Sequence, residues 1–328
     1  VFLEGNLKRL LACCVLLGLW PCAAGAASPT AFPSKSIRFI LQHAPGGYGD
    51  ITARLIARKM SDSMGQQVVV DNRPSAGAIV AANIVAKSEA DGYTMLLTGS
   101  GTAVSASLFK SLPYDVLKDF AQVSTMGFTE IVVLTGPEAK FNSLVEVLAF
   151  ARQNPGKLNI GCNNMGSTQH LAGALFARLA SIELNHIPYK GQSQAMTDLV
   201  GGQLNYMFSP LQNALPYIQQ GRIRAIAVAM IQRSPKLPQT PTLHELGYRD
   251  VDLSNWFAVY APAGTPPAVL KKLNAAFVKV GRSAEMREKF AKLGFEPFFT
   301  SPEEGTDFMR SELARWARVA AYAGIKAE

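Results

Sequence analysis

Two short turns rich in glycine and small polar residues are the segments of this sequence best suited to bind an anion. The first turn reads His43-Ala44-Pro45-Gly46-Gly47-Tyr48-Gly49-Asp50, and the second reads Gly161-Cys162-Asn163-Asn164-Met165-Gly166-Ser167-Thr168. Each follows an apolar, strand-like segment and precedes an amphipathic run typical of a helix. A helix N-terminus presents unpaired backbone N–H groups at the positive end of the helix dipole. If both turns face one cleft, they could hold an anion from two sides.

Single residues within the first turn allow more than one role. The glycines could simply provide a tight turn with positive φ angles. Asp50 would repel a carboxylate if it faced the ligand, so we expect it to cap the helix. Tyr48 could stack on an aromatic acid, donate its hydroxyl group to a carboxylate, or be a partly exposed loop residue. The dinucleotide-binding fingerprint needs a third glycine at a spacing that is missing here, so no nucleotide is expected.

The second turn could in principle hold a nucleophile and its base. Ser167 and His170 would then define a secreted α/β hydrolase, but the sequence has no Gly-x-Ser-x-Gly elbow, and no partner acid can be placed beside His170. Ser167 or Thr168 is favoured as a helix cap whose hydroxyl group also touches the ligand. The remaining histidines are far apart in the sequence, so neither a metal nor another cofactor is expected.

The start of the chain reads as a cleavable signal peptide over residues 1–26. Lys8 and Arg9 precede an apolar core over 10–20, and small residues follow at 24–26. A lipoprotein anchored at Cys22 is the alternative, although the bulky residues before this cysteine disfavour it. The protein is therefore expected in the periplasm. Cleavage would leave Cys162 as the remaining cysteine, which allows no internal disulfide.

The chain has 328 residues and a formal net charge of +8. Its lysines and arginines are scattered singly, without a basic run, so nucleic acid is not expected as a partner. Strand-like and helical segments alternate almost throughout, which favours an α/β fold with mostly parallel sheets flanked by helices. The segments that the pattern predicts as strands are 37–41, 68–70, 94–97, 131–134, 157–161, 184–187, 204–208, 223–230 and 256–261.

Helices are predicted from caps and periodicity. The clearest are a helix over 50–64 ended by Gly65, one over about 77–87, one beginning at Ser143 with a Ser143–Glu146 capping box, and one capped by Ser301 and Glu304. The Pro-rich stretch 233–241 is expected to be a loop. The strand over 256–261 is expected to return to the first half of the chain. The two strand–turn–helix units suggest two similar lobes.

Several motifs in order along the mature chain resemble one receptor family. They include Ala44-Pro45-Gly46-Gly47 with Asp50, Val69-Val70-Asp71-Asn72-Arg73-Pro74, Ala90-Asp91-Gly92-Tyr93-Thr94, His170-Leu171-Ala172-Gly173, Pro188-Tyr189-Lys190-Gly191 and Ala261-Pro262-Ala263-Gly264-Thr265-Pro266. These runs resemble the Bug-type extracytoplasmic solute receptors, the periplasmic components of tripartite tricarboxylate transporters.

The resemblance implies a two-lobed periplasmic binding protein of the Venus-flytrap type. One lobe would comprise 32–128 and 252–328, and the other 129–251. Ligand-binding positions carried over from the family are Pro45, Gly46, Gly47, Tyr48, Gly49, Ser100, Gly166, Ser167, Thr168, His170, Tyr189 and Ser209. Ser100 would belong to a loop, Ser100-Gly101-Thr102, and Tyr189 and Ser209 would lie near the distal end of the ligand.

The chain departs from the family pattern at two places that could shape specificity. Tyr48 and Gly49 replace a small residue followed by Thr, and Ser209 replaces a frequent Asp. The resemblance implies a monomeric, non-enzymatic receptor that passes a small carboxylate to integral membrane transporter subunits. A sensory subunit that presents its ligand to a signalling partner is the alternative, and the sequence does not separate the two.

Overall fold

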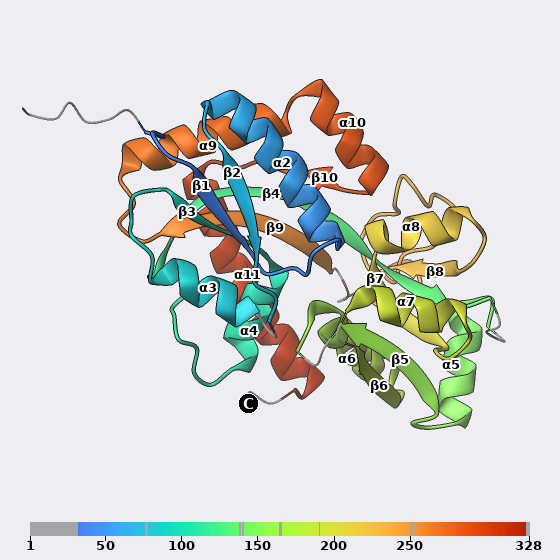
Figure 1. Ribbon diagram of the computed structural model, residues 1–328. Helices are drawn as coiled ribbons and strands as arrows, with labels where there is room; N and C mark the ends of the chain where they lie inside the picture. The colour runs from blue at the N-terminus through green and yellow to red at the C-terminus, as the bar shows by residue number, and fades with distance from the viewer. Residues whose placement is uncertain are drawn as a thin grey trace, which may run out of the picture. The chain divides into compact units, whose positions relative to one another are not determined.

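Two groups of strands share one long strand in this α/β fold (Figure 1). The computed structural model describes residues 32–75, 78–137, 139, 141–163, 166–189, 191–249, 251 and 253–325. The predicted signal peptide lies outside the described residues. The contacts define a compact unit over Lys35–Glu328, which is the part considered below.

The first group begins with three parallel strands. They are β1 (Ile37–Leu41), β2 (Val68–Asn72) and β3 (Thr94–Gly99), arranged in the order β2-β1-β3. Helices follow each of them along the chain: α2 (Tyr48–Met64), α3 (Ile79–Ala86) and α4 (Ser100–Leu108). This alternation of strand and helix is the arrangement expected of parallel strands.

The second group repeats the first. Its strands β5 (Leu158–Asn163), β6 (Leu184–Tyr189) and β7 (Tyr206–Pro210) are parallel and lie in the order β6-β5-β7. The helices that follow them are α6 (Thr168–Ala180), α7 (Gln192–Val200) and α8 (Leu211–Gln219). Because β5 matches β1 and α6 matches α2, the two glycine turns occupy equivalent places in the two groups.

The long strand β4 (Phe120–Thr135) joins the groups. It pairs with β9 (Ser254–Pro262) through Glu130 and with β7 from Ile131 onward, antiparallel in both cases. β8 (Arg224–Val228) and the short β10 (Glu296–Pro297) also pair with β4 in antiparallel fashion. Each group is therefore mixed, and the sequence prediction of mostly parallel sheets applies only to the three outer strands of each group.

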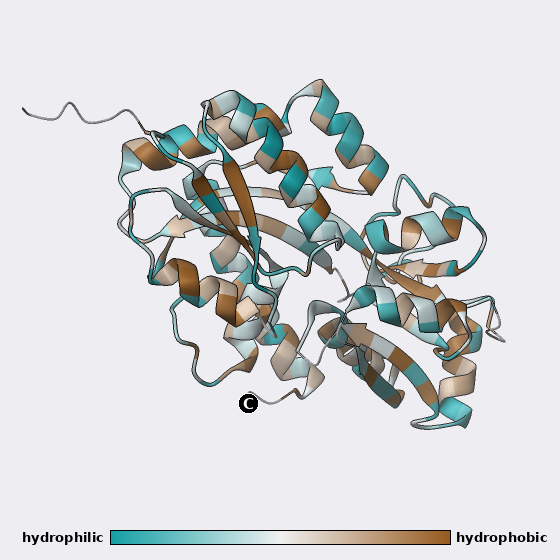
Figure 2. Ribbon diagram, viewed as in Figure 1, coloured by the Kyte–Doolittle hydropathy of each residue, from teal (hydrophilic) through white to brown (hydrophobic). Residues whose placement is uncertain are grey.

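The remaining helices complete the layers. These are α5 (Leu144–Gln153), α9 (Pro267–Gly281), α10 (Ala284–Leu293) and α11 (Pro302–Ala323). Apolar residues concentrate on the strands and on the helix faces that cover them (Figure 2). Trp256 on β9 and Trp316 on α11 are almost completely buried, and both indole N–H groups donate to Glu312.

Helix ends follow the sequence signals closely. Gly65 has φ +70° and donates its N–H to Ser61, which ends α2 as expected. Ser301 and Glu304 form the predicted capping box. The box predicted for α5 is incomplete. The Ser143 hydroxyl accepts from Glu146 N–H, but the Glu146 carboxylate accepts from the N–H of Asn142 rather than that of Ser143.

Sequence periodicity missed most of β4, of which only 131–134 was predicted. The strand is 16 residues long and is buried along almost its whole length, including polar residues such as Thr125, Thr129 and Glu130. A strand buried on both faces has no alternation of polar and apolar residues, and buried polar residues interrupt the apolar run by which such a strand is recognised.

Candidate functional site

The first turn connects β1 to α2 through Gly46, the glycine that needs a left-handed conformation, with φ +75°. Its N–H donates to the Asp50 carboxylate at 2.9 Å, and the N–H of Gly47 donates to the Ala44 carbonyl at 3.3 Å. Gly47 is the N-cap of α2, with φ −74° and ψ 163°. At Gly49 a Cβ atom would lie 2.5 Å from the His43 ring, so this glycine is required by close packing.

The second turn has nearly the same backbone. Gly166 also has φ +75°, and the N-cap of α6, Ser167, has φ −76° and ψ 162°. Gly166 N–H donates to Nδ1 of His170 at 3.1 Å, four residues further on, as Gly46 does to Asp50. The Ser167 hydroxyl accepts from the backbone N–H of His170 at 3.2 Å, so the predicted cap at Ser167 is confirmed.

These bonds bear on which backbone N–H groups could hold an anion. The N–H groups of Gly46, Gly47 and Gly166 were expected to point at a ligand, yet each donates within its own turn. The first N–H groups inside a helix have no intrahelical acceptor. The donors left for an anion therefore lie in the first turns of the helices and include those of Tyr48 and Gly49 in α2 and of Thr168 in α6.

A third helix, α4, begins beside the N-terminus of α6. Ser100 was expected in a loop, Ser100-Gly101-Thr102, but it is the first residue of α4, which follows β3 directly with Gly99 as N-cap. The Ser100 hydroxyl lies 3.0 Å from the Thr168 hydroxyl and 2.7 Å from Oδ1 of Asn255. Ser100 and Thr168 are both buried. The N-termini of α4 and α6, one from each strand group, are thus in direct contact.

The first turn is linked to the start of α4 by two routes. Gln42 follows β1 and accepts a hydrogen bond from the Thr98 hydroxyl at 2.8 Å, just before α4 begins. Phe257 is paired with Gly99 between β9 and β3, and its ring lies 5.9 Å from the ring of Tyr48. Both sequence-predicted turns therefore converge on the region around Ser100.

The Tyr48 side chain is turned into the protein. Its ring also packs near Phe295, at a centroid distance of 6.4 Å, and burial raises the pKa of its hydroxyl. The hydroxyl oxygen is buried. The Tyr48 ring packs against Phe257 and Phe295, and the residue as a whole is partly exposed. Its contact with a ligand stays a prediction.

Asp50, the acidic residue of the first turn, is engaged by its neighbours. It is 4 % exposed and accepts hydrogen bonds from Gly46, Arg54 and Asn72. Burial opposes its ionisation, but these bonds outweigh burial and lower the pKa of the carboxyl. The expected helix cap is not formed, because Gly47 is the N-cap of α2 and no side chain caps it. The Asp50 carboxylate instead closes the turn by accepting from Gly46.

His170 on α6 and His186 on β6 pack against each other beside the second turn. The His170 and His186 rings meet edge to face with centroids 4.8 Å apart. Burial lowers the pKa of His170, and burial together with the charge of His170 lowers the pKa of His186 to about 4. Because Nδ1 of His170 accepts from Gly166 N–H, this nitrogen carries no proton. Its lone pair is directed at Gly166, so Nδ1 is not placed to act as a base toward Ser167.

Two distal positions have hydroxyl groups that are already used. Tyr189 donates to Asp198 at 2.8 Å, and burial and this bond raise its pKa to about 12. Ser209 is fully buried, accepts from Gln192 at 2.9 Å and lies 3.1 Å from the carbonyl of Pro210. Both side chains are thus tied to α7, Tyr189 through Asp198 and Ser209 through Gln192.

Sequence reasoning missed three amide residues at these positions: Gln42, Gln192 and Asn255. Each lies at a strand end or a helix start, where ligands bind in open α/β sheets. An amide residue at such a boundary was the sequence signal that could have identified them. Among the described residues no group of three metal-ligating side chains is gathered at any point.

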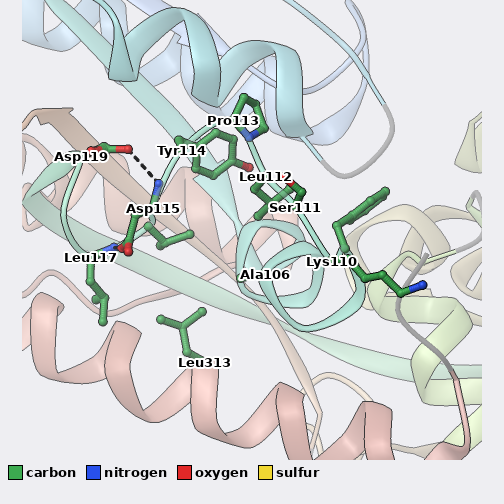
Figure 3. A pocket seen from close by; sticks show the side chains of 12 residues that line it. Ala106, Lys110, Ser111, Leu112, Pro113, Tyr114, Asp115, Leu117, Asp119 and Leu313 are labelled. Atoms are coloured by element: carbon green, nitrogen blue, oxygen red, sulfur yellow. Dashed lines mark hydrogen bonds between the residues drawn. The ribbon is translucent and has the colours of Figure 1, made fainter.

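A surface pocket of about 670 Å³ lies elsewhere, at the loop between α4 and β4 (Figure 3). Its polar groups stabilise the loop itself, since Asp119 accepts from the N–H of Asp115, and Asp115 accepts from those of Leu117 and Lys118. None of the sequence-predicted site residues lines it. We therefore assign it to loop structure.

Comparison with known proteins gives one consistent result. The family model described as "Tripartite tricarboxylate transporter family receptor" matches residues 52–325. Protein BugT of Bordetella pertussis is 38% identical over 326 residues, covering 98% of this chain and 99% of BugT. A UPF0065 protein of a Pseudomonas species is 37% identical over 290 residues, covering 88% of this chain and 86% of the relative.

Two solved structures resemble the chain closely and carry carboxylates by their descriptions. R. palustris Rpa4515 with adipate has a TM-score of 0.86 at 32% identity, covering 90% of this chain and 100% of the other. MatC from Rhodopseudomonas palustris with bound malate has a TM-score of 0.80 at 28% identity, covering 88% and 99%. The predicted two-lobed binding-protein fold is confirmed by these matches. None of the described helices is both long enough and apolar enough to cross a bilayer.

Proposed function

Because the chain belongs to the tripartite tricarboxylate transporter receptor family, a family of solute-binding receptors, we propose that it captures a small organic carboxylate in the periplasm. It would deliver this ligand to the membrane subunits of a transporter of that type. The observation that carries the proposal is the 3.0 Å contact between Ser100 and Thr168, which joins two helix N-termini from different strand groups.

The binding chemistry rests on dipoles instead of charges. The first residues of α2, α4 and α6 contribute backbone N–H groups, and the side-chain NH2 group of Asn255 adds a further donor. The hydroxyl groups of Ser100 and Thr168 bond to each other and hold the starts of α4 and α6 together. The helix dipoles favour negative charge at these ends, and their effect grows where water is excluded. A carboxylate group is the anion of matching size and hydrogen-bonding capacity for such a set of donors.

Closure of two lobes would complete the site. The proposed lobes are 32–128 with 252–328, and 129–251, and β4 changes its pairing from β9 to β7 close to this division. Hinge motion of this kind brings donors from both sides onto one ligand. The proposed ligand positions are those carried over from the family, with Gln42, Gln192 and Asn255 added.

The proposal is tested by binding of defined dicarboxylates. Adipate and malate are suitable probes because two structural relatives are described with them. A ligand at 100 times its Kd stabilises the folded protein by about 2.7 kcal/mol, which is measurable as a thermal shift. Absence of any shift and of any calorimetric heat across a panel of mono-, di- and tricarboxylates would contradict the proposal.

Two substitutions at one position separate the role of the N–H from that of the hydroxyl. Thr168→Val removes the hydroxyl, while Thr168→Pro removes both, and proline fits the first position of a helix. The extended ψ of 162° at Ser167 is compatible with a following proline. We expect Thr168→Pro to bind the probe about tenfold more weakly than Thr168→Val, since a hydrogen bond to a charged group is lost.

The matched control is Ala284→Pro. Ala284 is the exposed first residue of α10, capped by Ser283 in the same extended conformation. This variant carries the same backbone change at a helix start outside the site. It should leave carboxylate affinity unchanged. Equal affinities of Thr168→Pro and Thr168→Val would show that this N–H does not touch the ligand.

A further inference from the structure

Helices α9 and α10 carry most of the net charge of the chain. Residues 267–293 contain seven lysines and arginines and two glutamates, a net charge of +5 out of +8 for the whole sequence. Both glutamates are already in ion pairs, Glu285 with Lys59 and Lys289, and Glu288 with Lys292. Both carboxylates of these two helices are therefore already engaged by lysines.

Three exposed residues define what we call the α9–α10 basic surface: Lys279, Arg282 and Arg287. Among the described residues none of them forms an ion pair, and the Arg282 guanidinium makes one long hydrogen bond of 3.4 Å to the Phe299 carbonyl. Figure 2 shows hydrophilic positions along α10 with apolar positions between them. A surface that keeps arginines unpaired beside lysine–glutamate pairs has capacity for additional carboxylates.

A pocket of about 640 Å³ adjoins this surface. Arg282 and Arg287 line it together with Phe298 and with Glu304, whose carboxylate accepts from Ser301 N–H in the α11 cap. Phe298 is 49 % exposed, and within 267–300 it is the large apolar side chain most open to solvent. The two guanidinium groups can bind a carboxylate, and the exposed Phe298 ring can pack against an apolar side chain next to that carboxylate.

We propose that the α9–α10 basic surface docks an acidic protein segment in which Asp or Glu residues flank an apolar side chain. The carboxylates would pair with Arg282 and Arg287, and the apolar side chain would pack on Phe298. A bilayer surface fits less well, because interfacial binding uses several apolar side chains along one face, and this surface offers one.

The occupant is distinct from the small carboxylate ligand. No residue of the α9–α10 basic surface belongs to the proposed ligand site. Loss of peptide binding and loss of carboxylate binding can therefore be observed separately. If the protein serves a transporter, a periplasmic acidic segment of a membrane subunit would be the natural partner.

The test uses the full mature chain and a fluorescent ten-residue peptide with four Asp or Glu residues around one Phe. Binding is followed by anisotropy at about 0.1 M and about 1 M salt, over which the Debye length falls from about 10 to about 3 Å. We expect saturable binding that weakens with salt. The same peptide with Asn and Gln in place of the acids should not bind.

The decisive comparison is between two double variants of equal charge change. Arg282→Gln with Arg287→Gln should weaken peptide binding about tenfold, because both paired guanidinium groups are removed. Arg152→Gln with Lys157→Gln removes the same charge from exposed positions outside this surface, and should change binding less than about twofold. Equal weakening by both pairs would show attraction to net charge only and would overturn the proposal.

A second variant keeps the charge constant. Phe298→Ser should weaken binding of the peptide with Phe but not of an all-acidic peptide, while Val145→Ser, at a side chain 67 % exposed on α5, should have no effect. Vesicles of phosphatidylglycerol and phosphatidylcholine are the remaining arm. Retention by vesicles that depends on Arg282 and Arg287, without peptide binding, would assign this surface to a membrane and contradict the proposal, as would failure to bind either probe.

Discussion

The contact between Ser100 and Thr168 can be tested by a double-mutant cycle. Ser100→Ala removes two hydrogen bonds, to Thr168 at 3.0 Å and to Asn255 at 2.7 Å, whereas Thr168→Val removes one. A net hydrogen bond contributes about 1 kcal/mol to the free energy of unfolding. We expect losses of about 2 kcal/mol for Ser100→Ala and about 1 kcal/mol for Thr168→Val.

The double variant should lose about 2 kcal/mol, because the shared bond is counted once. The resulting coupling free energy is about 1 kcal/mol, which is above the usual additivity error of about 0.3–0.5 kcal/mol. Urea denaturation followed by fluorescence of the buried Trp256 and Trp316 measures it. Additive losses would refute the contact between the two helix N-termini, on which the proposed site depends.

A control cycle uses Ser107 on the same helix. Its hydroxyl donates to the Ala103 carbonyl at 3.0 Å, within α4 itself. Ser107→Ala combined with Thr168→Val should be additive, since the two side chains share no partner. Coupling in this control as well would mean that α4 responds as a whole to any change.

Three further predictions concern the core and the first turn. Glu312→Ala leaves the buried indole N–H groups of Trp256 and Trp316 without an acceptor, and should lower the free energy of unfolding by about 3 kcal/mol or more, with Glu312→Gln milder. Burial lowers the pKa of His43 to about 4, opposed by the charge of Asp50, so the unfolded chain binds more protons below about pH 6.5. Stability should therefore fall between about pH 6.5 and 4 by at most about 3 kcal/mol, and urea titrations at several pH values should show a flatter profile in His43→Gln. Gly49→Ala should destabilise by about 1–3 kcal/mol through a clash with the His43 ring, and adding His43→Ala should cost less than the sum of the two single changes, whereas a simple sum would exclude the clash as the cause.

Much of the fold was readable from local signals. β1, the end of α2 at Gly65, the cap of α11 and the Pro-rich loop were predicted because each depends on a few neighbouring residues. The return of β9 to the first strand group was also predicted and is confirmed by its pairing with β3. The full length of β4 was not predicted, because its polar residues look like solvent-exposed positions in the sequence. They are buried only through contacts with residues far away in the chain.

The candidate site also has parts that local sequence predicts and parts that it does not. The two turns were recognisable because a glycine with positive φ followed by a helix cap is a local pattern, and both have the expected form. Which N–H groups remain free was not recognisable. That depends on Asp50 and His170 folding back onto the glycine N–H groups, which the sequence allowed but did not require.

The sequence by itself determined the alternation of strands and helices, the two glycine turns, their helix caps and the family. These features are set by backbone conformation and by residues within one or two helical turns of each other. Only the tertiary structure decided that Ser100 begins a helix and meets Thr168, that the Tyr48 ring packs against Phe257, and that Asn255 accepts a hydrogen bond from Ser100. These are contacts between residues far apart in the chain, and they arise only when β4 and β9 bring the two strand groups together.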